Sequence, residues 1–489
     1  MKRTLLSTLL LLSFLFTAAL AQDAAPTEND YYPITDMQAP DGEIVEVGGI
    51  DIGPDGNVYA CTRHGDVWRI RDAFGDAPKW NLFARYLHEP LGLSWHKGWL
   101  YATQRPEVTR MKDEDGDGRA DVFECVSDGW GISGDYHEYA FGTRHDKNGD
   151  LWVVLCLTGS FSPNALYRGW VLRINENGNV TPTACGVRSP GGIGFGPDGK
   201  VYYCDNQGTW NGSSSMKHVA VGSFQGNPNG NVFFPFAKGA IGAEPPHPNY
   251  QNEEDRTVKA RERIPTYVPP AIMLPHGKMG QSPTGIETDH SGGKFGPFEG
   301  QIFIAEQTHS LVHRAYMEEV NGVMQGAAFP FRAGFKSGNI GLRISDDGAM
   351  FTGGSNRGWG ARGGQKFNFE RVNWTGKVPF EVHEMHVEKD GFALTFTKPI
   401  DTASAVDASF TMKAYTYQYK KGYGSPEVDM VTPTVKVAEV ADDGKSLRLL
   451  VEPMTKGHVH ELHLDGIKNA AGHKLLHDKA YYTLNEIPE

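Results

Sequence analysis

A segment made of two short apolar runs and a tight turn recurs six times in the first three quarters of the chain. Each copy starts with Gly, alternates along its length, turns at a site that usually contains Asp-Gly or Asn-Gly, and ends in an apolar-aromatic run. The copies begin at Gly49, Gly92, Gly142, Gly192, Gly285 and Gly341. Alternation with a period of two on both sides of such a turn is typical of a β-hairpin. The repeat therefore favours an architecture built from equivalent hairpins.

The spacing of the copies indicates how many strands each unit holds. Successive copies start 43 to 56 residues apart, except for one gap of 93 residues after Gly192. This spacing suits a four-stranded propeller blade. We therefore predict an all-β chain with a six-bladed β-propeller over residues 46–376, interrupted by a Pro-rich insertion at about residues 211–284. Residues 22–45 are expected to be a linker and a strand that closes the last blade.

The pattern changes after the sixth copy. Residues 377–489 contain short alternating runs such as "FALTFT" and "SLRLLVE", without the Gly-led hairpin of the blades. Several short strands within about a hundred residues are typical of a β-sandwich. We predict a separate immunoglobulin-like or fibronectin-like sandwich for this segment.

The N-terminus has the features of a secretory signal peptide. Lys2 and Arg3 precede an apolar run, and "AALA" offers small residues for cleavage after Ala21. We expect residues 1–21 to be removed and the mature protein to be periplasmic or secreted, with no membrane span. The net charge of -12 argues against nucleic acid as a partner. In an oxidising compartment some of the five cysteines could pair, and the sequence leaves their connectivity open.

The stretch "DEDGDGRADVFE", residues 113–124, has the ligand spacing of a calcium loop. Positions 1, 3, 5, 9 and 12 of this twelve-residue stretch are Asp113, Asp115, Asp117, Asp121 and Glu124, and position 6 is Gly118. In the second blade the stretch joins the third and fourth strands, which places it on the face away from the expected site. We predict a structural calcium ion there; the alternative is a solvated acidic turn without a metal.

Polar residues gather before each first strand and after each second strand of the repeat. In a propeller these positions meet at one end of the central channel, where they can bind a sugar or an organic cofactor. The candidates are Arg63, His64, Gln104, Arg105, Asp135, Tyr136, His137, Glu138, Arg188, Asp205, Asn206, Gln207, Trp210, Glu306, Gln307, His309, Asn356, Arg357, Trp359 and Arg362.

His137 is the best candidate for a general base in this group. It precedes an inner strand, and its acidic neighbours Asp135 and Glu138 could set its tautomer. A structural role for this histidine is the alternative. Arg188 could bind an anionic cofactor or substrate, or it could connect loops.

Several segments resemble the glucose/sorbosone dehydrogenases, which are soluble six-bladed propellers that use pyrroloquinoline quinone (PQQ) and calcium. "GVRSPGGIGFGPDGKVYYCDNQG" and "YHEYAFGTRHDKNGDLWVV" are similar to the family's arginine and histidine segments. "GKMGQSPTGI", "FGPFEGQIFIAEQTHS" and "GSNRGWGARGG" resemble a secreted bacterial subgroup of unestablished activity.

The resemblance implies oxidation of a sugar or sugar-derived aldehyde, with an electron acceptor that it does not identify. His137 would take the hydroxyl proton, and Arg188, Gln207, Gln307, His309 and Arg357 would contact the quinone. Backbone carbonyls of Gly208 and Thr209 would hold a second calcium ion. Two alternatives stay open: a non-catalytic carbohydrate-binding propeller, and a quinone-free carbohydrate hydrolase or lyase.

Overall fold

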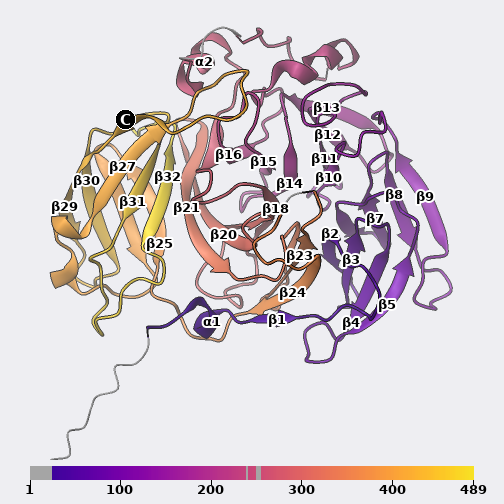
Figure 1. Cartoon of the computed structure of the whole chain (residues 1–489), viewed down its shortest axis with the longest axis horizontal. Helices are drawn as coiled ribbons and strands as arrows, with labels where there is room; N and C mark the ends of the chain where they lie inside the picture. Colours follow the sequence, from indigo (N-terminus) through magenta and orange to yellow (C-terminus); the bar gives the residue numbers. More distant parts are fainter. Residues whose placement is uncertain (1–24, 238–239, 249–254, 359) are drawn as a thin grey trace, which may run out of the picture.

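Six four-stranded antiparallel sheets are arranged in a ring around a central channel (Figure 1). The structure is a computed structural model, and it describes residues 25–237, 240–248, 255–358 and 360–489. The expected signal peptide, residues 1–21, and the candidate Trp359 lie outside these ranges. The predicted all-β propeller architecture is confirmed, because each copy of the sequence repeat supplies the two inner strands of one sheet.

The first four sheets follow the chain in order, from the inner strand to the outer one. They are β2 (Val47–Ile52), β3 (Val58–Thr62), β4 (Val67–Arg71) and β5 (Lys79–Ala84); β6 (Leu93–His96), β7 (Trp99–Thr103), β8 (Val108–Lys112) and β9 (Val122–Ser127); β10 (Ala140–Gly142), β11 (Leu151–Leu155), β12 (Trp170–Ile174) and β13 (Val180–Cys185); and β14 (Pro190–Phe195), β15 (Val201–Asp205), β16 (Ser214–His218) and β17 (Pro270–Leu274).

The last two sheets bring in both ends of the chain. The fifth is β18 (Pro283–Thr288), β19 (Ile302–Glu306), β20 (Leu311–Val320) and β21 (Val323–Ala333). The sixth is β22 (Gly341–Ile344), β23 (Ala349–Ser355) and β24 (Phe367–Asn373), completed by the N-terminal strand β1 (Ile34–Asp36). Helix α1 (Glu28–Tyr31) precedes β1. The ring is therefore closed by a strand that is more than 300 residues from its partner β24.

The glycine that opens each repeat lies where neighbouring inner strands converge. A Cβ atom on Gly49 would lie 2.8 Å from Cα of Gly92, and one on Gly285 would lie 2.6 Å from the carbonyl oxygen of Ile340. Contacts below about 3 Å leave no room for a side chain, so these positions require glycine. The glycine at the start of each repeat therefore reflects the close approach of neighbouring inner strands around the channel.

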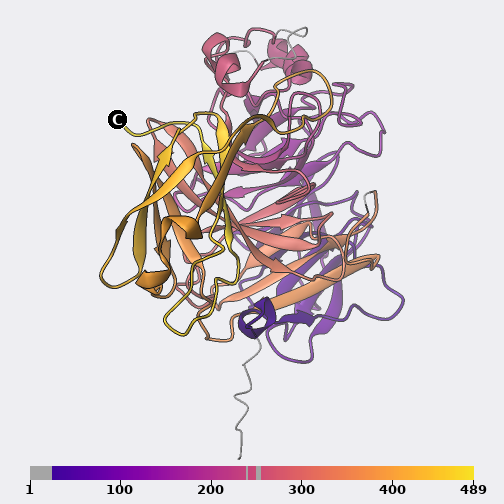
Figure 2. The ribbon, with the colours of Figure 1, turned by 60° about the vertical axis from the view of Figure 1, so that its left-hand side comes forward.

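The insertion is shorter than the sequence suggested. Strands β16 and β17 lie inside the predicted range 211–284, and they form the outer half of the fourth sheet. The segment that leaves the sheet is therefore 219–269, which contains the 3-10 helix η1 (Pro228–Phe236) and helix α2 (Thr257–Arg263). It lies at the edge of the ring (Figures 1 and 2).

The C-terminal segment forms two sheets beside the fifth blade. One is β25 (Val382–Glu388), β26 (Gly391–Phe396), β30 (Ser446–Glu452) and β29 (Thr434–Val440); the other is β32 (Lys479–Leu484), β31 (His458–His463), β27 (Thr411–Thr416) and β28 (Val428–Val431). Short 3-10 helices η2 (Thr402–Ser404) and η3 (Asp407–Ser409) lie between β26 and β27. The immunoglobulin-like or fibronectin-like topology stays a prediction.

The second C-terminal sheet is continuous with the propeller. β32 pairs antiparallel with β21, for example Ala327 with Tyr482, which gives one eight-stranded sheet. Phe329 of β21 also packs in the same buried cluster as Phe392 and Leu449 of the other C-terminal sheet. Backbone pairing and a shared core therefore cross the predicted domain boundary at residue 376.

The five cysteines, all in the described ranges, are unpaired, and four of them are buried. No helix in the described ranges is long and apolar enough to cross a membrane.

Candidate functional site

A cavity of about 380 Å³ opens at the end of the channel where the inner strands begin. Its floor is built from residues that precede three inner strands. His137 comes before β10, Arg188 and Ser189 come before β14, and Ser282 comes before β18. The repeat therefore brings these distant segments together, because every inner strand starts at the same end of the channel.

A hydrogen-bonded chain connects His137 to two serines at the cavity. Nδ1 of His137 lies 2.5 Å from Oγ of Ser160, and the Ser160 hydroxyl donates to Oγ of Ser189 over 3.1 Å. With the Ser160 proton directed toward Ser189, this chain is compatible with a donating Nδ1. In that tautomer Nε2 is the basic nitrogen of the ring.

The environment of His137 keeps the ring neutral. Burial, and after it the charge of Arg188, lowers the pKa of His137 to about 4, while Asp135 acts in the opposite direction. The imidazole is therefore uncharged at neutral pH and able to accept a proton.

The acidic neighbours of His137 bind groups of the loop around it. The Asp135 carboxylate accepts the main-chain N–H of His137 over 2.8 Å. The Glu138 carboxylate is buried and accepts from the amide of Ser133 over 2.8 Å and from the hydroxyl of Thr158 over 2.5 Å. The contact of the ring with Ser160 is one that local sequence did not indicate.

Arg188 is held in the cavity wall by groups that carry no negative charge. Its Nη1 donates to the carbonyl oxygens of Gln207 (2.7 Å) and Asn206 (3.4 Å). Its guanidinium carbon lies 5.5 Å from the ring centre of Phe161 and 5.0 Å from that of Tyr423, distances typical of cation–π contacts. Arg188 therefore lies at the site, as its sequence position predicted. Its contacts with Phe161 and Tyr423 were not predicted from the sequence.

The loop after Asn206 does not offer the second calcium site that the resemblance implied. The Gln207 carbonyl already accepts from the Arg188 guanidinium, whose positive charge would repel a calcium ion. The Gly208 carbonyl accepts the amide of Gly424 over 3.0 Å, and the Thr209 carbonyl accepts from the side chain of Asn227 over 3.2 Å. Gly208 and Thr209 thus serve contacts within the protein.

The other predicted cofactor contacts are spread over different environments. Gln207 lines the cavity, and Gln307 lines a smaller void of about 40 Å³ below it, with Nε2 bonded to the Ser355 carbonyl over 3.2 Å. Arg357 lines the same void, where Glu46 (3.0 Å) and Glu89 (3.2 Å) compensate its charge. His309 is buried and is not among the lining residues of either space.

Tyr423 is a lining residue that sequence reasoning missed. It lies in the loop between β27 and β28 of the C-terminal segment, and this loop reaches across the fourth sheet. Tyr423 forms a β-bridge with Thr209, and the amide of Trp210 donates to the Lys420 carbonyl over 2.9 Å. The C-terminal segment therefore supplies one wall of the cavity.

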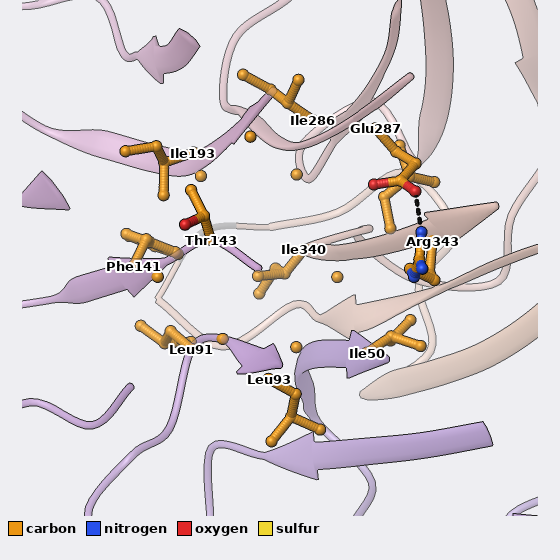
Figure 3. A pocket seen from close by; sticks show the side chains of 18 of the residues that line it. Ile50, Leu91, Leu93, Phe141, Thr143, Ile193, Ile286, Glu287, Ile340 and Arg343 are labelled. Atoms are coloured by element: carbon orange, nitrogen blue, oxygen red, sulfur yellow. Dashed lines mark hydrogen bonds and ion pairs between the residues drawn. The ribbon is translucent and has the colours of Figure 1, made fainter. Parts of the chain in front are cut away.

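The channel is differently built where the inner strands end (Figure 3). A void of about 60 Å³ is surrounded there by residues of all six inner strands. Arg343 is bonded to Glu287 and lies 3.0 Å from Asp51, and Arg144 lies 3.1 Å from Glu287. Each cation at this end has a carboxylate partner.

The predicted calcium loop lies on the face where the inner strands end. We call this end of the channel the compensated end, because Arg343 and Arg144 are paired with carboxylates there. It joins β8 to β9, and β8 runs in the same direction as the inner strand β6, because both are antiparallel to β7. Asp113, Asp115 and Asp117 bring carboxylate oxygens within 4.8 Å of one another. Asp121 instead accepts the amide of Glu114 over 2.9 Å, and Glu124 pairs with Arg110 at 2.5 Å. Three of the five predicted ligands therefore converge.

Several solved structures are similar to this chain, and the first of them supports the fold. A protein from Thermus thermophilus, described as an oxidoreductase of the glucose dehydrogenase type, is 17% identical with a TM-score of 0.51, over 70% of this chain and 99% of its own. The PQQ-bound aldose sugar dehydrogenase of Streptomyces coelicolor is 12% identical with a TM-score of 0.47, over 72% of this chain and 100% of its own. A Trichoderma reesei carbohydrate-active enzyme of family AA12 is 12% identical with a TM-score of 0.49, over 72% and 98%.

Similarity at this level of identity concerns the fold. No curated protein matches the sequence. A family model described as a domain of unknown function, DUF7133, matches residues 44–332, which is more than half of the chain. The chain therefore belongs to the DUF7133 family.

Proposed function

We propose that this chain binds a carbohydrate in the cavity at the mouth of the channel and that His137 accepts a proton from one of its hydroxyl groups. The observation that carries the proposal is the His137 ring at the cavity, whose Nδ1 is bonded to Ser160 and whose basic nitrogen is Nε2 when Nδ1 donates. Hydroxyl and amide groups of Ser282, Thr308 and Gln281 line the same cavity. Such groups match the donors and acceptors of a sugar.

Aromatic side chains at the cavity add to this match. Tyr136, Phe161 and Tyr423 line the space, and they are 67%, 50% and 61% exposed. An exposed aromatic ring beside polar groups can stack on the apolar face of a sugar ring. The volume of about 380 Å³ also lies in the usual range for small-molecule sites.

The residues present do not fit a calcium-bound PQQ as the resemblance implied. PQQ carries several carboxylates, and among the described residues Arg188 is the one Lys or Arg that lines the cavity. The carbonyls of Gly208 and Thr209, which the resemblance gave as calcium ligands, accept from the Gly424 amide and the Asn227 side chain. The proposal therefore assigns no step to a quinone, and quinone-dependent sugar oxidation is an outcome of the test below.

The test uses the purified mature chain with a panel of aldoses and sugar acids. Calorimetry should show binding at millimolar sugar, and NMR of the reaction mixture should show conversion that His137→Gln abolishes while binding persists. Failure of every sugar to bind would refute the proposal, and binding without conversion would leave a carbohydrate-binding protein. Dye reduction that requires added PQQ would replace it with sugar oxidation.

We propose further that the chain is exported and that Asp113, Asp115 and Asp117 bind calcium. Export rests on the features of residues 1–21, and mass spectrometry of the mature protein should find Gln22 at its N-terminus. The calcium proposal rests on the three convergent carboxylates and on Gly118, whose φ of 92° permits the sharp turn of such loops.

A further inference from the structure

The cavity has an uncompensated positive charge in a protein that is acidic as a whole. The chain has a net charge of -12. Among the described residues that line the cavity, Arg188 is the one Lys or Arg, and none is Asp or Glu. The remaining lining groups are hydroxyls, amides, imidazoles, aromatic rings and glycines. This composition favours a ligand with a negative charge.

Arg188 is buried, so its positive charge lies inside the protein and not on the solvated surface. The residue is 4% exposed, and no ion pair to its side chain is found within the described ranges. Its Nε is buried without a hydrogen-bond partner. Asp205 accepts the main-chain amides of Arg188 and Ser189, but its charge is matched by Lys217 at 3.2 Å. A buried cation is costly without an anionic partner, so a ligand that supplies one gains a strong charge-assisted bond.

Three features hold the guanidinium in position. It packs flat against Gly208, where a Cβ atom would lie 2.0 Å from Cζ of Arg188. Phe161 and Tyr423 flank it, and their contacts are cation–π contacts. Tyr423 is fixed in turn by its bridge to Thr209 and by the bond from the Gly424 amide to the Gly208 carbonyl. The charge is thus pre-organised by the propeller and by the C-terminal loop together.

From this arrangement we infer that the natural ligand is a carboxylate-bearing sugar, such as a uronic or aldonic acid, with its carboxylate on Arg188. The inference rests on the proposed function, which it deepens by naming the ligand class. Bound carboxylate would neutralise Arg188 and so remove one of the two main causes of the low pKa of His137. The acidic sugar would thereby strengthen the base that acts on its hydroxyl group.

The test compares sugars that differ in charge and little else. Calorimetric titrations at pH 7.5 would use galacturonate against galactose and glucuronate against glucose. A charge-assisted bond of about 1.5–3 kcal/mol corresponds to roughly 10- to 150-fold tighter binding of the acid. Arg188→Gln should abolish this preference, so that the acid and its neutral counterpart bind the variant with equal affinity. Lys79→Gln, which removes an exposed charge elsewhere, is the matched control and should keep the preference.

A second readout does not depend on the folding of Arg188→Gln. In the wild-type chain, NMR titration of the His137 ring should show a higher pKa when galacturonate is bound than when galactose is bound. Tyr423→Ala should weaken the acid preference while Tyr423→Phe keeps it, because a phenyl ring preserves the contact with Arg188.

The outcomes separate this inference from the proposed function. Equal affinity for acidic and neutral sugars would overturn the inference and leave the proposed function intact. Failure of all sugars to bind would overturn both. PQQ supplies the same chemical group, so binding of PQQ alone, lost in Arg188→Gln, would assign the carboxylate to a quinone and overturn the sugar acid.

Discussion

Arg343 and Arg188, at opposite ends of the central channel, have opposite electrostatic settings, although Arg357 near the mouth is paired with Glu46 and Glu89. Where the inner strands end, Arg343 and Arg144 share Glu287, and Asp51 completes the network. Where the inner strands begin, Arg188 meets carbonyl oxygens and aromatic rings. Both ends belong to the same six strands, so the difference comes from the partners of each arginine.

This difference separates a structural role from a binding role. An arginine paired with carboxylates inside the protein has its charge satisfied before any ligand arrives. An arginine held by neutral groups keeps its charge available to a ligand. We therefore expect substitutions at the compensated end to change stability, and substitutions at the mouth to change ligand binding.

The largest expected effect is a loss of stability at the compensated end. Glu287→Gln removes the carboxylate that Arg343 and Arg144 share and leaves Arg343 with Asp51 alone. Breaking a fully buried pair costs about 3–5 kcal/mol, and because part of the network remains we expect a loss of about 3 kcal/mol. Urea unfolding should show this loss, while sugar affinity measured on the folded variant stays unchanged. Glu176→Gln, whose partner Lys97 is exposed, is the control and should unfold like the wild type. A selective loss of ligand binding in Glu287→Gln would contradict the structural role assigned to this end of the channel.

Calcium removal should give the next largest effect, on the same face. If calcium binds the 113–124 loop, a concentration 100 times its dissociation constant stabilises the fold by about 2.7 kcal/mol. Chelation should therefore lower the melting temperature, and Asp115→Asn should abolish that response without altering sugar affinity. Asp443→Asn, in an exposed C-terminal turn, should retain the response. An unchanged melting temperature on chelation would identify the loop as an acidic turn without a metal.

Gly208→Ala should act on binding more than on stability. The added Cβ would meet the guanidinium of Arg188, which can swing away, so the destabilisation should stay below the roughly 1–3 kcal/mol of a rigid overpacked core. The preference for an acidic over a neutral sugar, measured by calorimetry, should become smaller. Gly242→Ala is the control, because nothing lies within 4 Å of its added methyl group. Retained acid preference in Gly208→Ala would show that the position of Arg188 is unimportant.

The smallest expected effect is a shift in titration. Because the charge of Arg188 contributes to the low pKa of His137, Arg188→Gln should raise that pKa from about 4 toward 6.5, as followed by NMR of the ring. The low pKa of His137 also makes the free energy of unfolding depend on pH. His137 binds fewer protons in the folded state, so its contribution is present above about pH 6.5 and is lost as the pH falls toward 4. An unchanged pKa would mean that burial alone neutralises the ring.

Features determined by local sequence were predictable. The Gly-led hairpins identified the two inner strands of every sheet, because alternation and turn residues are local signals. Strand β16 was missed because its sequence, "SSMKH", shows no apolar alternation. Its buried Lys217 is tolerated only because Asp205, on the neighbouring strand β15, compensates the charge. Such a strand can be recognised only when its partner is known.

In the candidate site, too, the residues whose positions depend on local sequence were predictable. His137 and Arg188 were found because they precede inner strands, and the topology brings all such positions together. Ser160 was missed because its contact with His137 depends on a backbone with a φ of 66°, which no local pattern indicated. Tyr423 was missed because more than 200 residues separate it from Arg188, and a loop of another sheet delivers it to the cavity.

The pairing of β32 with β21 has a consequence for the order in which the molecule is made. Residues 479–484 form the last strand of the chain, and they seal the open edge of the fifth blade. Until those residues are synthesised, β21 presents an unpaired strand edge of the kind that promotes aggregation. Residues 479–484 therefore cover the edge of a four-stranded blade begun some 200 residues earlier, and a nascent chain that stops before them would have an exposed edge.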